Sequence, residues 1–146
     1  MELMSKVHGK IKYSETEVIT FSKGLPGFEG LSNFIIKEIQ GNPLFKIIHS
    51  LDKTDVAFVI VSPFECVNQY EIKLSEETLS GLQISEPTDV VLYSIVTLHS
   101  EMKNITANLK APLVVNLKKN LGEQIIINKE GYLVQHPIFK EVMECS

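Results

Sequence analysis

The side chains with the widest chemical range in this sequence are four histidines and two cysteines. No histidine belongs to an HExxH or comparable pair, so no run of sequence supplies the closely spaced ligands of a zinc site. His49 lies in a predicted strand, and we expect it to have a hydrogen-bonded structural role. Cys66 and Cys145 are too few and too far apart for a disulfide framework, and we interpret them as a buried thiol and a thiol in the tail. The other histidines are His8, His99 and His136.

Carboxylates and hydroxyls offer no stronger basis for catalysis. Asp52 and Asp55 are close enough in sequence to be pictured as paired carboxylates, but they lie in a short polar loop, where aspartate commonly bonds the backbone. The sequence has no GxSxG elbow and no glycine-rich loop followed by a helix and a lysine. We therefore predict a protein that is not an enzyme and that needs no cofactor or metal.

The most distinctive stretch is Phe21–Gly30, in which three glycines and one proline fall within seven residues. Glycine tolerates positive φ and proline fixes φ, so Leu25-Pro26-Gly27 suits a type II turn with Pro26 and Gly27 at its centre. Three large apolar side chains flank the turn, and burying them is favourable. We interpret the stretch first as a structural corner, second as a recognition loop and only third as a catalytic or phosphate loop. The apolar side chains are Phe21, Leu25 and Phe28.

Length and charge restrict the class of protein further. A chain of 146 residues predicts a single domain spanning residues 1–146. Its net charge of −4 weighs against nucleic acid or an anionic membrane as the main partner, because both require clustered lysine and arginine. The sequence shows no hydrophobic signal segment and no apolar run near the ~20 residues of a membrane-spanning helix. We expect a cytoplasmic protein with no direct contact to nucleic acid or membrane.

Short runs of β-branched residues, separated by turn signals, predict a sheet protein. Val56–Ser62 is continuously apolar, which is typical of a central strand covered on both faces, and it ends at Pro63. The predicted fold class is all-β: a predominantly antiparallel small barrel or sandwich with one short helix. The expected strands are Val7–Tyr13 at an edge, Glu17–Phe21, Phe34–Ile39, Leu44–Leu51, Val56–Ser62, Asp89–Leu98, Thr106–Leu109, Leu113–Leu117, Gln124–Asn128 and Tyr132–Val134, with Lys118–Gly122 as a polar loop.

The helix is predicted at Ser75-Glu76-Glu77-Thr78, which resembles a capping box with Ser75 as the N-cap. The two early glutamates favour the positive end of the helix dipole. Leu79 and Leu82 are three positions apart and can share a buried face. A single short helix in such a chain is expected to plug an open end of the barrel or to cover a sheet edge.

A small β-barrel that binds nucleic acid or a small ligand is the alternative function. Such a barrel needs aromatic residues on a basic face, so that bases stack while the phosphates are neutralised. The phenylalanines here lie mostly in apolar contexts that predict burial, and the lysines are dispersed apart from Lys118-Lys119. These charge arguments place nucleic-acid binding behind protein binding.

The order of several motifs resembles that of a known family, the flagellar assembly factor FliW. The first block contains Gly24-Leu25-Pro26-Gly27-Phe28-Glu29, and the resemblance extends from about Val18 to Ile138. No single block is diagnostic, but the ordered set is specific. The further blocks are Ser50-Leu51-Asp52 with Asp55-Val56-Ala57-Phe58, then Thr106-Ala107-Asn108-Leu109-Lys110-Ala111-Pro112-Leu113-Val114-Val115-Asn116, and finally Gln124, Tyr132 and His136-Pro137.

This resemblance implies a small β-barrel-like protein with a regulatory role in flagellum biogenesis. It implies two protein partners in the cytoplasm, flagellin and the translational regulator CsrA. Binding of CsrA would relieve the repression of flagellin translation, so the protein would act as a CsrA antagonist and as a chaperone-like flagellin-binding protein. An effect of flagellin level on translation further requires that the two partners exclude each other or are negatively coupled.

Four polar residues are our candidates for partner contacts. Asp52 and Asp55 lie in the polar turn, where backbone bonding is the alternative role. Glu71 follows the Phe64–Tyr70 segment and could equally lie on a solvated face. Asn108 lies in the second long block and could instead cap the backbone with its amide.

Overall fold

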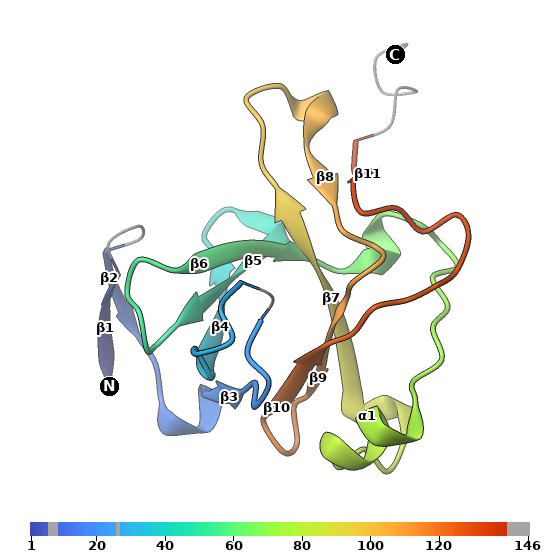
Figure 1. The fold of residues 1–146 in the computed structure, drawn as a ribbon. Helices are drawn as coiled ribbons and strands as arrows, with labels where there is room; N and C mark the ends of the chain where they lie inside the picture. Colours follow the sequence, from blue (N-terminus) through green and yellow to red (C-terminus); the bar gives the residue numbers. More distant parts are fainter. Residues whose placement is uncertain (6–8, 26, 140–146) are drawn as a thin grey trace.

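The computed structural model describes residues 1–5, 9–25 and 27–139, and within them the chain is mostly β-structure with one short α-helix (Figure 1). The predicted fold class is therefore confirmed. The strands are β1 (Glu2–Ser5), β2 (Gly9–Lys12), β3 (Ile19–Thr20), β4 (Asn33–Ile39), β5 (Asn42–Ser50), β6 (Ala57–Val61), β7 (Val90–Thr97), β8 (Thr106–Ala107), β9 (Leu113–Asn116), β10 (Leu121–Gln124) and β11 (His136–Pro137), and the helix is α1 (Glu76–Gly81).

The large sheet closes into a ring. Its strand order is β11-β8-β7-β6-β5-β4-β3-β10-β9, and an additional pairing of β7 with β9 joins the last strand back to the third. All but one of the pairings in this sheet are antiparallel; the exception is the parallel pair of β10 and β3, in register at Leu121 and Thr20. Ring closure satisfies the strand edges that an open sheet would leave unpaired.

The inside of the ring is an apolar core contributed by every side of it. Phe21 and Phe34 are fully buried and meet edge to face, with ring centroids 5.4 Å apart. Ile48, Ile60 and Leu113 complete the centre and are also inaccessible to solvent. Each large buried side chain of this kind stabilises the fold by roughly 1.5–3 kcal/mol relative to its exposed state, so the core dominates stability.

The Phe21–Gly30 stretch is the structural corner that the sequence predicts. Phe21 and Leu25 lie in the core. The Phe28 N–H donates to the Leu25 carbonyl over 2.7 Å and Gly27 has φ +84°, as a type II turn requires at that position. Pro26, the other predicted centre of the turn, lies outside the described residues. The corner packs inward, so glycine here serves backbone geometry.

The last predicted ring strand is shifted along the sequence. We expected Lys118–Gly122 as a loop and Gln124–Asn128 as a strand, but β10 covers Leu121–Gln124 and pairs with β9. Asn120, at φ +55°, completes the turn two residues earlier than predicted. Gly122 lies within this strand, and a Cβ there would lie 2.5 Å from the Phe21 ring, so only glycine leaves room for that ring.

One further strand prediction was wrong, and another was confirmed only in part. Tyr132–Val134 is not a strand, and the terminal pairing is formed by β11 at His136–Pro137 with β8. The N-terminal prediction Val7–Tyr13 corresponds to β2, which pairs only with β1 in a separate hairpin; residues 6–8, including His8, lie outside the described residues.

His49 has the structural role predicted for it. It is 1% exposed, its Nδ1 donates to the Ser50 carbonyl over 2.7 Å, and its Nε2 lies 2.6 Å from Ser5 Oγ. A carbonyl oxygen only accepts, which fixes the proton on Nδ1. The histidine therefore joins the N-terminal hairpin to β5. Cys66 is buried as predicted, whereas Cys145 lies outside the described residues.

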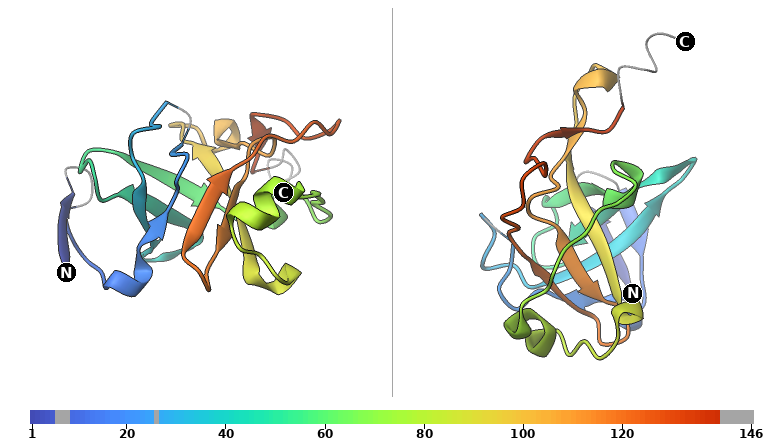
Figure 2. Two further views of the ribbon diagram at one scale, coloured as in Figure 1. Left: turned by 60° about the horizontal axis from the view of Figure 1, so that its bottom comes forward. Right: turned by 90° about the vertical axis from the view of Figure 1, so that its right-hand side faces the viewer.

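Between β6 and β7 the chain makes a long excursion, residues 62–89, which carries α1 (Figures 1 and 2). Ser75 is the N-cap, since its hydroxyl accepts from the Thr78 N–H over 3.2 Å; the reciprocal half of the predicted capping box is absent because Thr78 is not an acidic or amide residue. Thr78 donates to Glu123, and Asn116 donates to the Leu82 carbonyl. The helix thus covers the ends of β9 and β10. Within the described ranges, no helix is long and apolar enough to cross a membrane.

Candidate functional site

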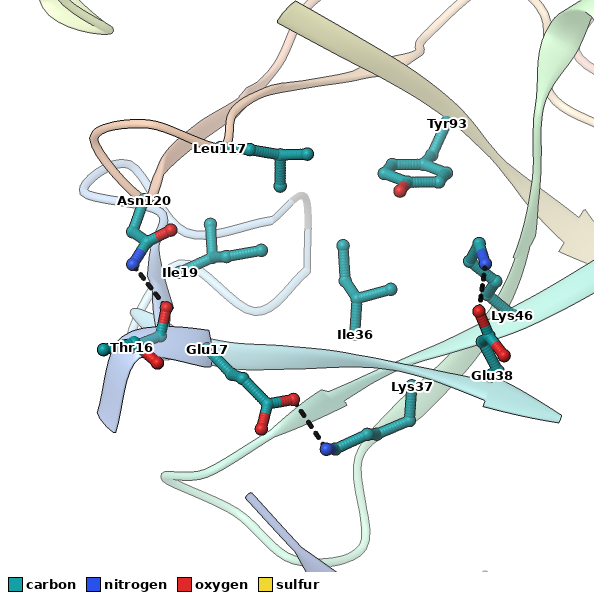
Figure 3. A pocket seen from close by; sticks show the side chains of 10 residues that line it. All are labelled: Thr16, Glu17, Ile19, Ile36, Lys37, Glu38, Lys46, Tyr93, Leu117 and Asn120. Atoms are coloured by element: carbon teal, nitrogen blue, oxygen red, sulfur yellow. Dashed lines mark hydrogen bonds and ion pairs between the residues drawn. The ribbon is translucent and has the colours of Figure 1, made fainter. Parts of the chain in front are cut away.

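A pocket of about 350 Å³ opens at one end of the ring (Figure 3). Its apolar lining comes from four elements of the ring: Ile19 on β3, Ile36 on β4, Tyr93 on β7 and Leu117 after β9. Ile19 belongs to the core cluster, Ile36 and Tyr93 pack against it, and the four side chains point toward one another across the opening. The pocket is therefore the uncapped end of the core, shaped to accept an apolar group.

Charged side chains around this pocket are paired with one another. Lys37 Nζ lies 2.6 Å from Glu17 Oε2, and this hydrogen bond is the main reason why the pKa of Glu17 lies below its usual range. Lys46 and Glu38 are 3.5 Å apart. Because each charge has a partner, the pocket offers no single-sign field for a charged substrate.

The pocket does not assemble the relays that acid–base or nucleophilic catalysis needs. The pKa of its half-buried phenol, Tyr93, is raised by desolvation, so the phenol stays protonated near neutral pH. Across residues 1–5, 9–25 and 27–139, no group of three or more His, Cys, Asp and Glu side chains is placed to hold a metal ion. The geometry fits binding by shape and apolar contact.

Asp52, the first of the predicted contact residues, links two loops. Its Oδ2 accepts from the N–H groups of Asn33 and Ser32, at 2.9 and 2.8 Å. These bonds, that of Asn33 first, hold the pKa of Asp52 below its usual range. The carboxylate thus ties the β5–β6 loop to the start of β4.

The side chain of Asn108 likewise forms hydrogen bonds with the backbone. Its Oδ1 accepts from the N–H groups of Lys110 and Ala111, each over 3.0 Å, which shapes the bend before β9. Asp55 and Glu71 are exposed, and Glu71 Oε2 lies 3.9 Å from Lys129 Nζ. Asp52 is exposed as well, but its carboxylate is engaged by the backbone, so Asp55 and Glu71 are the two exposed candidates without such backbone bonds, and they lie on different loops.

The sequence motifs missed the larger surface feature, a mostly apolar groove of about 720 Å³ beside β7. It runs between the Val90–Leu92 end of β7 and the excursion that precedes it. Phe64, 51% exposed, stands at one end and meets Tyr70 edge to face. The side chains that the excursion contributes include Phe64, Ile72, Leu74, Leu79 and Ile84.

Three polar contacts hold the extended segment at residues 69–74 over the protein. The buried Tyr70 hydroxyl donates to the Leu109 carbonyl over 2.6 Å, and burial raises the pKa of that phenol. The Glu71 N–H donates to the Tyr132 hydroxyl over 2.6 Å, and this hydroxyl donates to the Gln69 carbonyl. The Tyr70 and Tyr132 rings lie 4.6 Å apart. One wall of the groove therefore depends on hydrogen bonds to two tyrosines.

The sequence of this chain matches the model of a known protein family. A family model described as FliW protein matches residues 2–138. The chain belongs to the FliW family. This match confirms the resemblance inferred from the ordered motifs. Members of the family are flagellar assembly factors, which indicates a role in flagellum biogenesis.

Relatives within the FliW family match over almost the full chain. The flagellar assembly factor FliW of Clostridium botulinum (strain Langeland / NCTC 10281 / Type F) is 46% identical over 141 residues, which cover 97% of this chain and 99% of the relative. That of Clostridium kluyveri is 41% identical over 145 residues, covering 99% and 100%. A crystal structure of the flagellar assembly factor FliW aligns with a TM-score of 0.88 at 36% identity, covering 97% and 99% of the two chains. Sequence and architecture therefore agree.

Proposed function

We propose that this protein is a non-enzymatic, cytoplasmic regulator that binds flagellin and CsrA and so relieves the repression of flagellin translation by CsrA. The observation that carries the proposal is membership of the FliW family over residues 2–138. Two features are consistent with it: an apolar pocket and an apolar groove open to solvent, and carboxyl groups with lowered pKa values that are engaged in structural bonds. Protein recognition fits such surfaces better than turnover of a substrate does.

The coupling between the two partners is open to a direct test. Purified flagellin is titrated into a preformed complex of this protein with CsrA, and released CsrA is measured by size-exclusion chromatography. Release in proportion to added flagellin is the expected result, because flagellin level can reach translation only through exclusion or negative coupling. A stable ternary complex that holds CsrA with unchanged affinity contradicts the proposal.

An electrostatic contribution follows from the net charge of −4. CsrA must offer a basic surface to RNA, and an acidic protein docked beside it raises the free energy of bringing phosphates close. Asp55→Asn and Glu71→Gln test the two exposed candidate contacts, with the exposed Glu130→Gln as a matched control. Weaker binding of CsrA and weaker competition with RNA are expected for the first two variants and not for the third. If both variants still bind CsrA and compete with RNA as well as the unsubstituted protein does, the electrostatic contribution is refuted.

A further inference from the structure

The pairing of strands around the ring is incomplete where β6 ends. β6 pairs with β7 only at Ile60 with Ile95 and at Val61 with Ser94, although β7 begins at Val90. Pro63 follows, and proline has no N–H to continue a ladder. Over Val90–Tyr93, β7 is paired with β9 on one edge, and no strand among the described residues pairs with the other edge. Figure 1 shows this lower part of β7 with β9 on one side and the excursion, without a strand, on the other.

The groove runs along this unpaired edge. Val90–Leu92 and Ile72–Leu74, a segment without assigned secondary structure, both line it. Successive residues of a strand direct their backbone N–H and C=O groups to alternate edges, so part of Val91–Tyr93 presents donors and acceptors toward the groove. Unpaired backbone groups next to apolar walls are costly unless water or another chain satisfies them.

Charge is unevenly distributed along the sequence: the segment that contributes to the groove is acidic, although the lining of the groove itself carries one lysine, Lys73, and one glutamate, Glu86. Residues 62–92 contain six acidic residues and one lysine, a net charge of −5, whereas the whole chain has −4 and the remainder is therefore +1. Asp89 is paired with Lys118 at 2.9 Å, but Glu76 and Glu77 are exposed on the first turn of α1. A chain that approaches this surface is favoured if it carries lysine or arginine.

We propose that the groove binds an extended peptide segment of a protein partner, which adds as a strand to the Val90–Tyr93 edge of β7. The segment has apolar side chains at alternate positions, to fill the groove beside Leu79 and Ile84, and basic residues at its flanks. Backbone hydrogen bonds supply affinity, and alternate side-chain pockets together with the acidic rim supply specificity. The inference rests on the proposed function only in taking the protein to act through protein partners; it requires neither flagellin nor CsrA.

The test uses a short synthetic peptide of alternating valine and threonine with two lysines at each end, titrated into the full-length protein. Fluorescence anisotropy measures its affinity, and hydrogen exchange followed by NMR reports on the amides of Val91–Tyr93. Binding is expected to slow exchange of at least one of these amides. A glutamate-flanked peptide is expected to bind at least tenfold more weakly at low salt, and the difference shrinks as salt rises.

Two N-methylated versions of the peptide separate strand addition from other modes. In one, alternate N–H groups are methylated; in the other, the pattern is moved by one residue. A strand paired with β7 uses only one of the two sets, so one version loses at least tenfold in affinity while the other retains most of it. Equal effects of the two patterns, as a helix or a non-specific apolar contact would give, overturn the proposal.

Protein variants locate the site independently of the peptide chemistry. Phe64→Ala and Glu76→Gln/Glu77→Gln are each expected to weaken binding at least threefold, the second only at low salt, while the exposed Glu130→Gln has no effect. Binding unchanged in both variants, or slowed exchange only outside the groove, places the site elsewhere and refutes the inference. So does concentration-dependent self-association that removes the peptide, because a second copy then fills the groove.

These outcomes are separable from failure of the proposed function. If flagellin displaces CsrA but the peptide does not bind, the role in flagellin regulation stands and the groove assignment fails. If the peptide binds at the groove but neither flagellin nor CsrA binds the protein, the proposed function fails and the strand-binding edge remains.

Discussion

Two stretches outside the strands of the ring, the Phe21–Gly30 corner and the 62–89 excursion, are attached to it in different ways. The corner inserts side chains into the core: Phe21 is 0% and Leu25 1% exposed. The excursion also buries Tyr70 and Leu82, but specific hydrogen bonds fix its course, including Tyr70 to Leu109 and Asn116 to Leu82. Because its apolar side chains insert into the core, the corner is an integral part of the fold. The excursion is attached by hydrogen bonds, and this attachment leaves an open groove at its side.

The largest expected difference between the two regions is in how much stability is lost when a phenylalanine ring is removed. Phe21→Ala empties a position in the centre of the core and should lower the free energy of unfolding by about 3–5 kcal/mol. Phe64→Ala removes a half-exposed ring of the excursion and should cost less than about 1 kcal/mol. Urea denaturation followed by circular dichroism measures both. Similar costs for the two variants would mean that the excursion is as much a part of the core as the corner is.

Within the corner, two glycines with positive φ should differ. A Cβ on Gly24 would lie 2.6 Å from the Glu29 Cα, whereas a Cβ on Gly27 meets nothing within 4 Å. Gly27→Ala should therefore cost only the backbone strain, about 1 kcal/mol, and Gly24→Ala at least about 1 kcal/mol more, since backbone must move. The same unfolding measurement orders them. A reversed order contradicts the tight packing assigned to the corner.

The excursion should respond to loss of a single hydroxyl. Tyr132→Phe removes the acceptor of the Glu71 N–H and the donor to the Gln69 carbonyl, at a cost of about 0.5–1.5 kcal/mol. The change should be local, so hydrogen exchange at residues 69–74 should accelerate while the amides of β4 and β5 keep their protection. Uniform acceleration throughout the ring would show that the two regions unfold as one unit.

The smallest effect is expected from acid. Asp52 beside the corner and Asp89 in the excursion both have pKa values below the usual range, through the N–H groups of Asn33 and Ser32 and through Lys118, respectively. A depressed folded-state pKa contributes stability that is present above the unfolded pKa of about 3.9 and is lost as pH falls through the folded value. Stability should decline below about pH 4, and less steeply in Asp52→Asn and Asp89→Asn. Urea midpoints between pH 3 and pH 7 measure this, and parallel profiles in all three proteins would exclude these carboxylates as the source.

Local signals in the sequence predicted much of the fold. Glycine and proline chemistry at Leu25–Gly27 defined the corner, the side chain of Ser75 marked the start of α1, and the apolar run around β6 placed that strand correctly. Each of these features depends on residues within a few positions of one another. The position of β10 was not predictable in this way, because its Gly122 pairs with Val115 of β9 and is packed against the ring of Phe21, which is distant in the sequence.

The candidate site was less predictable for the same physical reason. Asp52 was recognised as a turn residue, but its acceptors bond Ser32 and Asn33, about twenty positions away, and no local pattern encodes that pairing. The groove depends on where β6 ends relative to β7, which is a property of sheet register. The sequence did contain one usable signal for it: acidic residues are concentrated in residues 62–92.

The parallel pair of Thr20 with Leu121 has a consequence for how the protein is made. The ring closes only when a strand near the start of the chain meets one near its end, and such long-range closure slows folding because a long loop must be ordered first. During synthesis, the N-terminal strands must wait until β10 has left the ribosome before their core can be sealed. The folded protein should therefore appear after translation is nearly complete, and nascent chains that stop before Leu121 should remain sensitive to protease.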